Sequence, residues 1–593
     1  MNTSTSDQVS TLRNFQGILA LAAITAFAAP AAPAAAAPLA ADLQIPPVPS
    51  APRPQAGTAR HVMVAAANPL AVEAGEAVLR RGGSAIDAAV AVQAVLGLVE
   101  PQSSGLGGGA FLVWYDAKTH QATAYDGRET APAGATAAQF TRPDGTLYNF
   151  AEAITGGIST GVPGAIAMLD RAQHDHGHLP WSTLFATAQS LATTGFTVSP
   201  RLAMSIRFPF AGARAPDAVA YFTKPDGTQY AAGDTLKNPA YAQTLGQIAQ
   251  NRANALLTGP IAADIVARVH QGPLPSTMTL ADLAAYQPHV TPALCEPYRT
   301  VTICTPQAPS GGPALQEALG ILAHTDLPAH GPSDPQGWFL FAEASRLAYA
   351  DRDRYEGDPA FIKFPQTGLL APDYLAARAA LIGPRAMANV TYGHPAGAPT
   401  FAPDGTPEPG GTSHVVIVDA AGNALSMTTT VESIFGSGRM VDGFFLNNQL
   451  TDFSFAPRAP NGTPAANALA PGKRPRSTMA PVIVLSRNGR FKAALGSPGG
   501  SSILAYNLKG VVGLIDWGLA PQQIAALPNL VAHGPSFTAD PFPPALLAAL
   551  AARGMPLDTA RGEASGLQVL VRQPDGSLSG GADPRREGEA RGF

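Results

Sequence analysis

The sequence is poor in charged residues and in cysteine. Only 13% of its 593 residues are charged, about half of the fraction in an average soluble domain, and the formal net charge is -4. Because the chain has no basic stripe, nucleic acid is a poor candidate partner. Two cysteines are too few for a zinc ribbon, a c-type haem site or an iron–sulfur cluster.

Several catalytic motifs are also missing. The glycine-rich stretch Gly105–Gly109 is not followed by the Lys-Ser/Thr pair of a phosphate-binding loop. No Gly-x-Ser-x-Gly elbow and no His-Glu-x-x-His helix occurs, so serine-hydrolase and zinc-protease interpretations lack support. The chain is 46% hydrophobic, which excludes disorder over the whole length. No internal repeat is evident.

Residues 1–41 predict an export signal. Arg13 is the one charged residue between Asp7 and Asp42, and it precedes the apolar run Ile18–Ala29, which is too short to span a bilayer. The alternative is a disordered Ala/Pro-rich leader. We therefore expect a soluble mature protein in the periplasm or the medium, with an extended Pro-rich linker over residues 42–60.

Cys295 and Cys304 lie nine positions apart. An exported protein permits a disulfide that bridges a short hairpin, and two buried free thiols are an equal alternative.

The hydrophobic pattern predicts helices over residues 70–81 and 84–98, the second buried on all sides. Residues 390–411 form a Gly/Pro-rich break, followed directly by strand patterns over 412–418, 424–431 and 443–447. A long structureless segment that runs into a buried strand is often functional. A threonine made N-terminal by cutting there would be a nucleophile with its own amine as the base.

From about residue 61 onward the sequence resembles the γ-glutamyltransferase family, also known as γ-glutamyltranspeptidases or glutathione hydrolases. The resemblance rests on the shared order of motifs over about 450 residues. These motifs are Gly83–Val90, Gly105–Gly109, Asp126–Pro132, Thr160–Gly164, Ser310–Pro313, Glu343–Asp358, Thr412-Ser-His, Phe435–Gly438, Leu446–Gln449, Lys473–Met479 and Gly496–Gly500.

The resemblance implies an α/β (α+β) N-terminal-nucleophile hydrolase, a four-layer αββα sandwich made as an inactive precursor. Self-cleavage between Gly411 and Thr412 would give a large subunit, residues 61–411, and a small catalytic subunit, residues 412–593. By spacing alone, Thr412 is an ordinary strand residue; the family context reverses that interpretation. Thr430 matches the threonine that supports the nucleophile, and the N–H groups of Gly499 and Gly500 match the oxyanion hole.

The resemblance also implies how a γ-glutamyl group is held. Arg128 matches the clamp on its α-carboxylate, together with the hydroxyls of Ser477 and Thr478. Gln449 and Asp452 match the positions that bind its α-ammonium. The structural alternatives are a surface pair of Arg128 with Glu129, packing of Thr430 in its strand, and ordinary turns for Ser477–Thr478, Leu446–Gln449 and Pro498–Gly500.

Glu432 departs from the family pattern, because many members carry asparagine there. A carboxylate at this position strengthens ammonium recognition or alters acyl preference, or it forms a local ion pair. The segment 453–472 is a second departure. In many members it is a lid that bears a tyrosine, whereas here it lacks tyrosine and is a few residues shorter, which predicts a more open pocket.

His174, His176 and His178 lie at short spacing, but a solvated loop is favoured over a metal site there. Neither a metal nor an organic cofactor is expected.

The sequence therefore predicts a self-processing γ-glutamyl hydrolase/transferase that acts on glutathione and related γ-glutamyl amides, with water or an amine as acceptor. Its two chains form a heterodimer, without nucleic acid or membrane in the mature form. A cephalosporin- or glutaryl-type acylase of the same fold is the first alternative, and a non-catalytic exported binding protein is the second.

Overall fold

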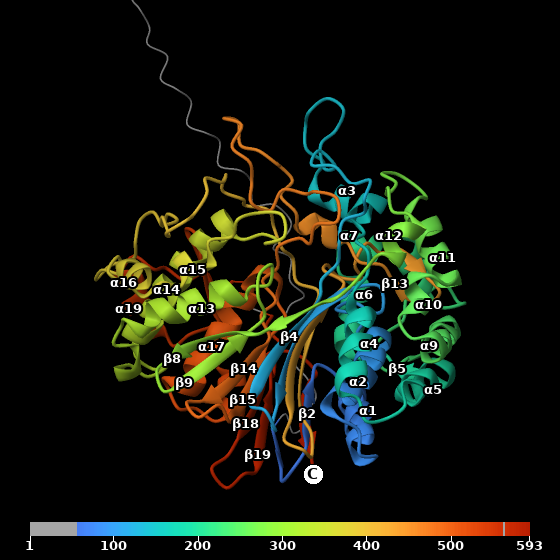
Figure 1. Cartoon of the computed structure of the whole chain (residues 1–593), viewed down its shortest axis with the longest axis horizontal. Helices are drawn as coiled ribbons and strands as arrows, with labels where there is room; N and C mark the ends of the chain where they lie inside the picture. The colour runs from blue at the N-terminus through green and yellow to red at the C-terminus, as the bar shows by residue number, and fades with distance from the viewer. Residues whose placement is uncertain (1–55, 561–563) are drawn as a thin grey trace, which may run out of the picture. The chain divides into compact units, whose positions relative to one another are not determined.

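Two seven-stranded antiparallel sheets lie face to face in the computed structural model, which describes residues 56–560 and 564–593 (Figure 1). The first sheet has the order β1 (Gly57–Ala59), β19 (Leu578–Ala582), β18 (Gln568–Arg572), β15 (Phe491–Gly496), β14 (Val482–Ser486), β9 (Val301–Thr305), β8 (Leu294–Tyr298). The second has the order β20 (Glu589–Gly592), β2 (Met63–Ala66), β10 (Thr412–Val418), β11 (Ala424–Thr430), β3 (Gly109–Asp116), β4 (Gln121–Gly127), β7 (His289–Pro292).

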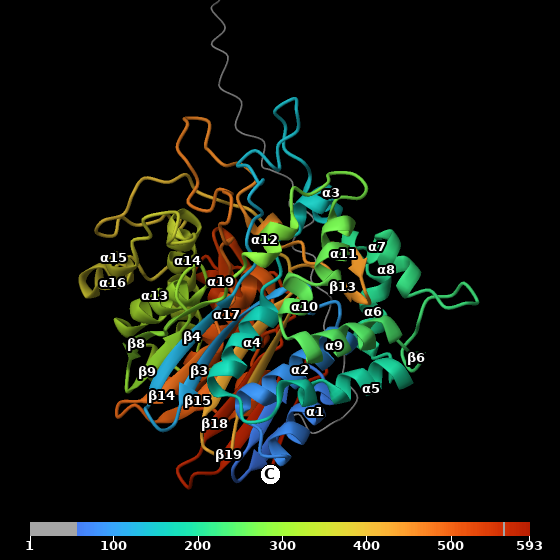
Figure 2. The same ribbon diagram turned by 45° about the vertical axis from the view of Figure 1, so that its right-hand side comes forward.

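Helices cover the outer face of each sheet, as Figures 1 and 2 show. The second sheet is covered by α1 (Pro69–Arg80), α2 (Ala85–Val99) and α4 (Ala165–His176), with α5 (Ala186–Thr194), α9 (Pro239–Asn251) and α11 (Pro260–Val269) further out. The first sheet is covered by α13 (Gly312–Ala323), α17 (Ile503–Ile515) and α18 (Pro521–Ala526), with α14 (Pro335–Tyr355) behind α13. The predicted four-layer αββα arrangement is confirmed.

Shorter elements connect these layers. The helices are α3 (Phe150–Thr155), α6 (Pro200–Arg207), α7 (Ala211–Arg214), α8 (Pro216–Tyr221), α10 (Asn254–Leu257), α12 (Leu280–Ala284), α15 (Gln366–Leu369), α16 (Pro372–Ala379), α19 (Pro544–Ala552). The strands are β5 (Phe196–Thr197), β6 (Thr235–Leu236), β12 (Met440–Val441), β13 (Phe444–Phe445), β16 (Leu530–His533), β17 (Ser536–Ala539). The 3₁₀ turns are η2 (Gly157–Ser159), η3 (Trp181–Leu184), η4 (Leu327–Ala329), η5 (Gln449–Asp452), η6 (Gly500–Ser502).

Strand β10 is buried on both faces because it lies between a helical layer and the other sheet. Val416 and Val418 belong to the core between the two sheets. Val415 and Ile417 point the other way, into the core beneath the helices, as the two-residue period of a strand requires. The first residue of this strand, Thr412, is thereby fixed at the centre of the sandwich.

The two predicted N-terminal helices are confirmed as α1 and α2. Asn68 caps α1 by accepting a hydrogen bond from Leu70 N at 3.0 Å, with Pro69 in the first turn. Ser84 and Asp87 form a reciprocal capping box on α2, every residue of which is buried. These caps satisfy N–H groups that burial would otherwise leave unpaired.

Three expectations about local structure were wrong. The fold already includes Gly57–Ala59, which pairs with β19, so the linker does not extend to residue 60. Only Phe444–Phe445 of the strand predicted over 443–447 is a strand, because Leu446 and Asn447 instead bond to loops at Arg439 and Gly107. The remainder of the predicted linker, and the predicted signal over residues 1–41, lie outside the described residues.

The histidine cluster was the third wrong expectation. His174 and His176 belong to the last turn of α4 rather than to a loop. The His176 ring stacks on Trp114 with centroids 4.8 Å apart and bonds to the hydroxyl of Tyr125 at 2.9 Å. This packing against β3 and β4 extends the helix through residues whose sequence favoured a turn.

Cys295 and Cys304 are directly opposite each other on β8 and β9 and form a disulfide. Of the two alternatives that the sequence left open, the structure has the bridged hairpin. Within residues 56–560 and 564–593, no helix is both long and apolar enough to cross a bilayer.

Candidate active site

The β10–β11 pairing places two threonine hydroxyls next to each other. Thr412 and Thr430 are directly paired across the strands, and their Oγ1 atoms are 3.2 Å apart. Thr430 Oγ1 donates to the carbonyl oxygen of Gly411 at 2.7 Å and accepts from Glu432 N at 2.8 Å. Since its one proton goes to Gly411, Thr430 is an acceptor for the hydroxyl of Thr412. The hydrogen bond from Thr430 therefore polarises the peptide bond between Gly411 and Thr412.

Gly411 is packed too closely to carry a side chain. A Cβ atom there would lie 2.4 Å from the carbonyl oxygen of Glu432 and 2.5 Å from that of Ser433. Real Cβ atoms never come so near to backbone, so this approach requires glycine. The close packing holds the 411–412 bond against the chain that follows β11.

A small cavity of about 20 Å³ lies at Thr412. It is lined by Arg128, Glu408, Pro409, Thr412, Thr430, Glu432, Gln449, Asp452, Thr478, Met479, Gly500 and Ile503. The structure thus brings together eight of the residues singled out in the sequence, although they are spread from position 128 to position 500. Ser477, Gly499 and Gly411 lie next to lining residues in the chain but do not line the cavity themselves.

Arg128 is fully buried just after β4. Its Nη2 donates to Asp452 Oδ2 at 2.5 Å and to the carbonyl oxygen of Arg476 at 2.7 Å, and its Nε donates to that of Pro475 at 3.1 Å. The alternative of a surface pair with Glu129 is wrong. The two groups are 3.9 Å apart, but both are buried, and burial raises the pKa of Glu129 to about 8.

Three buried acceptor oxygens belong to residues that line the cavity together with Arg128. Glu432 Oε1, Gln449 Oε1 and Asp452 Oδ1 receive no hydrogen bond from an N–H donor of the described residues. Asp452 uses its other oxygen to accept from Arg128 and from Gln449 Nε2, the latter at 2.6 Å. Unpaired buried acceptors are rare in folded proteins, so their convergence on one cavity marks a site for a ligand with several N–H donors.

Glu432 is held in a backbone conformation that side chains seldom adopt. Its φ is 81°, in the left-handed region, and its N–H is tied to Thr430. Its Oε2 accepts from Ser433 Oγ and Asn448 Nδ2. Burial, together with the neighbouring carboxylate of Asp452, raises the pKa of Glu432 well above its usual range. Burial raises that of Asp452 to about 6 against the pull of Arg128.

The lining also includes the hydroxyl of Thr478 and the backbone of Gly500, which follows Gly499. Thr478 Oγ1 lies 2.6 Å from the carbonyl oxygen of Gly500 and 3.1 Å from Glu408 Oε2. Gly499 and Gly500 have φ values of 145° and 56°, which turn the chain sharply into η6 and α17. The Ser477 hydroxyl oxygen accepts a hydrogen bond from Met479 N at 3.1 Å, which stabilises the turn at these residues.

Glu408 was not singled out in the sequence, yet it fills much of this site. Arg352 Nη2 donates to both oxygens of its carboxylate, at 2.6 and 2.9 Å, and Arg476 Nε does so at 3.3 Å. Its own carbonyl oxygen accepts from Ser501 N at 2.9 Å. Residues 390–411 contain no helix or strand, as expected, but buried charges anchor the segment. The sequence feature that could have indicated Glu408 is charge, because Asp404 and Glu408 are the two charged residues of 401–411.

Arg586 is a second residue that the sequence did not indicate. Its Nη1 donates to the carbonyl oxygen of Thr412 at 2.8 Å, and burial lowers its pKa to about 9. It reaches Thr412 from the segment before β20, 174 positions away. No local motif marks it.

The tyrosine-free segment 453–472 does not place an aromatic ring in the cavity. Phe455 stacks on Phe140 with centroids 4.4 Å apart and also contacts Phe150. Phe453 is buried in the same cluster. In the continuous chain Glu408 and Pro409 contribute to the lining of the cavity, so a more open pocket stays a prediction for the cut protein.

The described residues contain no group of three or more His, Cys, Asp or Glu arranged to hold a metal ion.

Known proteins are similar to this chain over most of its length. The family model described as "Gamma-glutamyltranspeptidase" matches residues 71–593. The glutathione hydrolase proenzyme of Bacillus subtilis (strain 168) is 33% identical over 570 residues, covering 94% of this chain and 95% of the relative. The glutathione hydrolase proenzyme of Escherichia coli (strain K12) is 33% identical over 543 residues, 89% of this chain and 91% of the relative.

Among solved structures, the cephalosporin acylase from Bacillus halodurans superposes with a TM-score of 0.80 at 26% identity, over 92% of this chain and 98% of that one. The fold is that of the N-terminal-nucleophile hydrolases. With the family model covering most of its length, the chain belongs to the γ-glutamyltranspeptidase family.

Proposed function

We propose that this protein is a self-processing γ-glutamyl hydrolase/transferase that uses Thr412 as its nucleophile. The observation that carries the proposal is one cavity whose lining combines Thr412, the guanidinium of Arg128 and the acceptor oxygens of Glu432, Gln449 and Asp452. A γ-glutamyl group carries an α-carboxylate and an α-ammonium on one carbon. The cavity offers a cation for the first and acceptors for the second.

Self-cleavage follows from the contacts of the precursor. The Thr412 hydroxyl attacks the Gly411 carbonyl carbon while Thr430 stabilises the developing negative charge on the carbonyl oxygen, to which it already donates. The C–N bond then breaks and the nitrogen takes up the proton, which leaves an ester on Thr412. Water hydrolyses this ester to give a carboxylate on Gly411 and a free α-amine on Thr412.

The new α-amine completes the catalytic group. Its unperturbed pKa of about 8 leaves part of it neutral near pH 7, so that it accepts the hydroxyl proton during attack on the γ-carbonyl. The N–H groups of Gly499 and Gly500 stabilise the oxyanion. The amine of the substrate's leaving group takes the proton, and the γ-glutamyl ester is then passed to water or to the amine of an amino acid or peptide.

Recognition divides between the two sides of the cavity. Arg128, with the hydroxyls of Ser477 and Thr478, holds the α-carboxylate. Gln449, Asp452 and Glu432 hold the α-ammonium. The amide oxygen of Gln449 and the two carboxyl groups offer the acceptors that an ammonium group needs.

The two products of cleavage stay together because both sheets contain strands from each. In the second sheet, β10 and β11 lie between β2 and β3, and in the first sheet β14 pairs with β9. Separation of residues 61–411 from 412–593 would break these ladders and expose both cores. We therefore propose that the two products form a stable heterodimer. We also propose, from the sequence of residues 1–41, that the protein is exported to the periplasm or the medium.

A comparison of two acyl groups tests the proposal. γ-Glutamyl and glutaryl p-nitroanilide differ only in the α-ammonium, and we expect kcat/KM to be at least about 100-fold higher for the γ-glutamyl compound because the acceptor side would otherwise stay unpaired. A preference for the glutaryl compound would instead support an acylase. The likeness to a cephalosporin acylase favours that second candidate. A non-catalytic binding protein does not explain the Thr430–Gly411 contact.

Substitution of Glu408 should slow self-cleavage. Glu408→Gln removes the charge that pairs with Arg352 and Arg476, three residues before the scissile bond, so the Gly411 carbonyl is held less firmly. We expect the rate to fall about tenfold or more. The measurement is the appearance of two chains on denaturing gels over time. Asp404→Asn, in the same segment but further from the bond, is the matched control and should slow cleavage less.

Glu432 should give substrate binding a pH dependence. Its raised pKa makes it neutral at low pH, and it gains charge as the pH rises, which strengthens attraction to the α-ammonium. For γ-glutamyl p-nitroanilide we expect the KM of the unaltered enzyme to fall about three- to tenfold as the pH rises and Glu432 loses its proton, relative to Glu432→Gln. Parallel KM profiles for the two proteins would contradict this role.

A further inference from the structure

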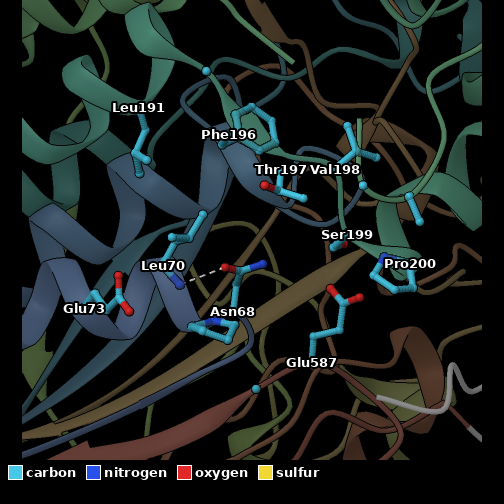
Figure 3. A pocket seen from close by; sticks show the side chains of 15 residues that line it. Asn68, Leu70, Glu73, Leu191, Phe196, Thr197, Val198, Ser199, Pro200 and Glu587 are labelled. Carbon is cyan, nitrogen blue, oxygen red and sulfur yellow. Dashed lines mark hydrogen bonds between the residues drawn. The ribbon is translucent and has the colours of Figure 1, made fainter. Parts of the chain in front are cut away.

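A second cavity, of about 520 Å³, lies between the start of α1, the start of α6 and the segment that precedes β20 (Figure 3). It shares no lining residue with the cavity at Thr412. Its lining residues are Asn68, Pro69, Leu70, Glu73, Leu191, Gly195, Phe196, Thr197, Val198, Ser199, Pro200, Ala232, Gly233, Glu587 and Gly588. Its volume falls in the range of about 300–1,000 Å³ that is typical of small-molecule sites.

The walls of this cavity are largely apolar, and its charges have one sign. Leu70, Leu191 and Phe196 point into it from α1, α5 and β5. Glu73 and Glu587 are its two charged lining residues, and the lining set contains no lysine, arginine or histidine. An anionic ligand is therefore disfavoured, whereas a cation with an apolar body matches both features.

Glu587 supplies the specific contact. Its Oε1 accepts a hydrogen bond from Arg201 N at 2.9 Å, but its Oε2 is buried and accepts none from the described residues. Figure 3 shows the carboxylate directed toward the space between Asn68 and Ser199. A buried carboxylate oxygen without a donor is costly, and a bound N–H group would remove that cost. Glu73, by contrast, already lies 3.6 Å from Arg591.

We propose that this cavity binds a small organic cation, whose primary ammonium group donates to Glu587 Oε2 and whose apolar body packs against Leu70 and Phe196. The site is independent of the proposed function, because it involves none of the residues around Thr412. A neutral apolar ligand of the same size would leave Glu587 Oε2 unpaired and would bind more weakly.

Calorimetric titration with 2-phenylethylamine tests the site. The full chain carrying Thr412→Ala is titrated, because it stays continuous and keeps Glu408 and Pro409 in the lining of the other, much smaller cavity. We expect saturable one-to-one binding of 2-phenylethylamine, with an affinity that falls about tenfold or more in Glu587→Gln. The affinities of 2-phenylethanol and 3-phenylpropionate for the unaltered cavity should be lower than that of the amine by a similar factor. Leu70→Trp fills the cavity and should also weaken binding.

The matched control is Asp452→Asn in the same background, which should leave the affinity for 2-phenylethylamine unchanged. Loss of binding in that variant, with none in Glu587→Gln, would place the amine at Thr412 and overturn the proposal. Equal affinity for the amine and the alcohol would overturn it too, as would absence of saturable binding. If Glu587→Gln lowers the Tm, Leu70→Trp decides between the outcomes.

Discussion

Thr412→Ala should abolish both self-cleavage and acyl transfer. The variant has no hydroxyl to attack the Gly411 carbonyl, and the chain stays continuous, so neither the nucleophile nor the α-amine base ever forms. We expect one uncut chain and a fall in kcat/KM of at least about 10⁴-fold toward γ-glutamyl p-nitroanilide. Denaturing gels and anilide release measure the two effects on the same preparation.

Thr412→Ser is the matched control for this variant. Serine keeps the hydroxyl within reach of Thr430, so self-cleavage and part of the activity should remain. Turnover by uncut Thr412→Ala protein would show that another group is the nucleophile, and efficient cutting of that variant would show that the hydroxyl does not start the cleavage.

Substitution of Arg128 should have the second largest effect. Arg128→Met removes the one guanidinium that lines the cavity and also leaves Asp452 without its closest partner. Because the α-carboxylate of the substrate loses its charge-assisted partner, we expect kcat/KM for γ-glutamyl p-nitroanilide to fall about 10³-fold. Steady-state kinetics on fully cut protein measures this loss.

Two comparisons separate recognition by Arg128 from its structural role. Butyryl p-nitroanilide has no carboxylate to bind, so its slow hydrolysis should change little in Arg128→Met. Arg128→Lys keeps the charge but not the forked geometry and should recover part of the rate. Equal losses for the γ-glutamyl and butyryl compounds would mean that Arg128 supports the cavity without contacting the substrate.

The sequence predicted those parts of the molecule in which local pattern and environment agree. The hydrophobic patterns over 70–81 and 84–98 predicted α1 and α2, and the structure caps these helices with Asn68-Pro69 and Ser84–Asp87. The apolar run over 415–418 matches a strand covered on both faces. The residues of the cavity came from ordered motifs, because no short-range pattern would bring Arg128 next to Asp452.

What the sequence did not indicate depends on contacts between distant segments. Glu408 lies among glycines and prolines that suggested exposure, and only Arg352 and Arg476, folded against it, make it a buried anchor. Arg586 reaches Thr412 across 174 positions. Similarly, the helical turn at His174–His176 depends on packing against Trp114, which overrides the local preference for a loop.

Intact-mass analysis with N-terminal sequencing of the purified protein tests the central claim most directly. The account predicts two chains that remain associated under native conditions, the smaller of which spans residues 412–593 and begins with Thr412. A single uncut chain, or a cut at any bond other than Gly411–Thr412, would contradict it.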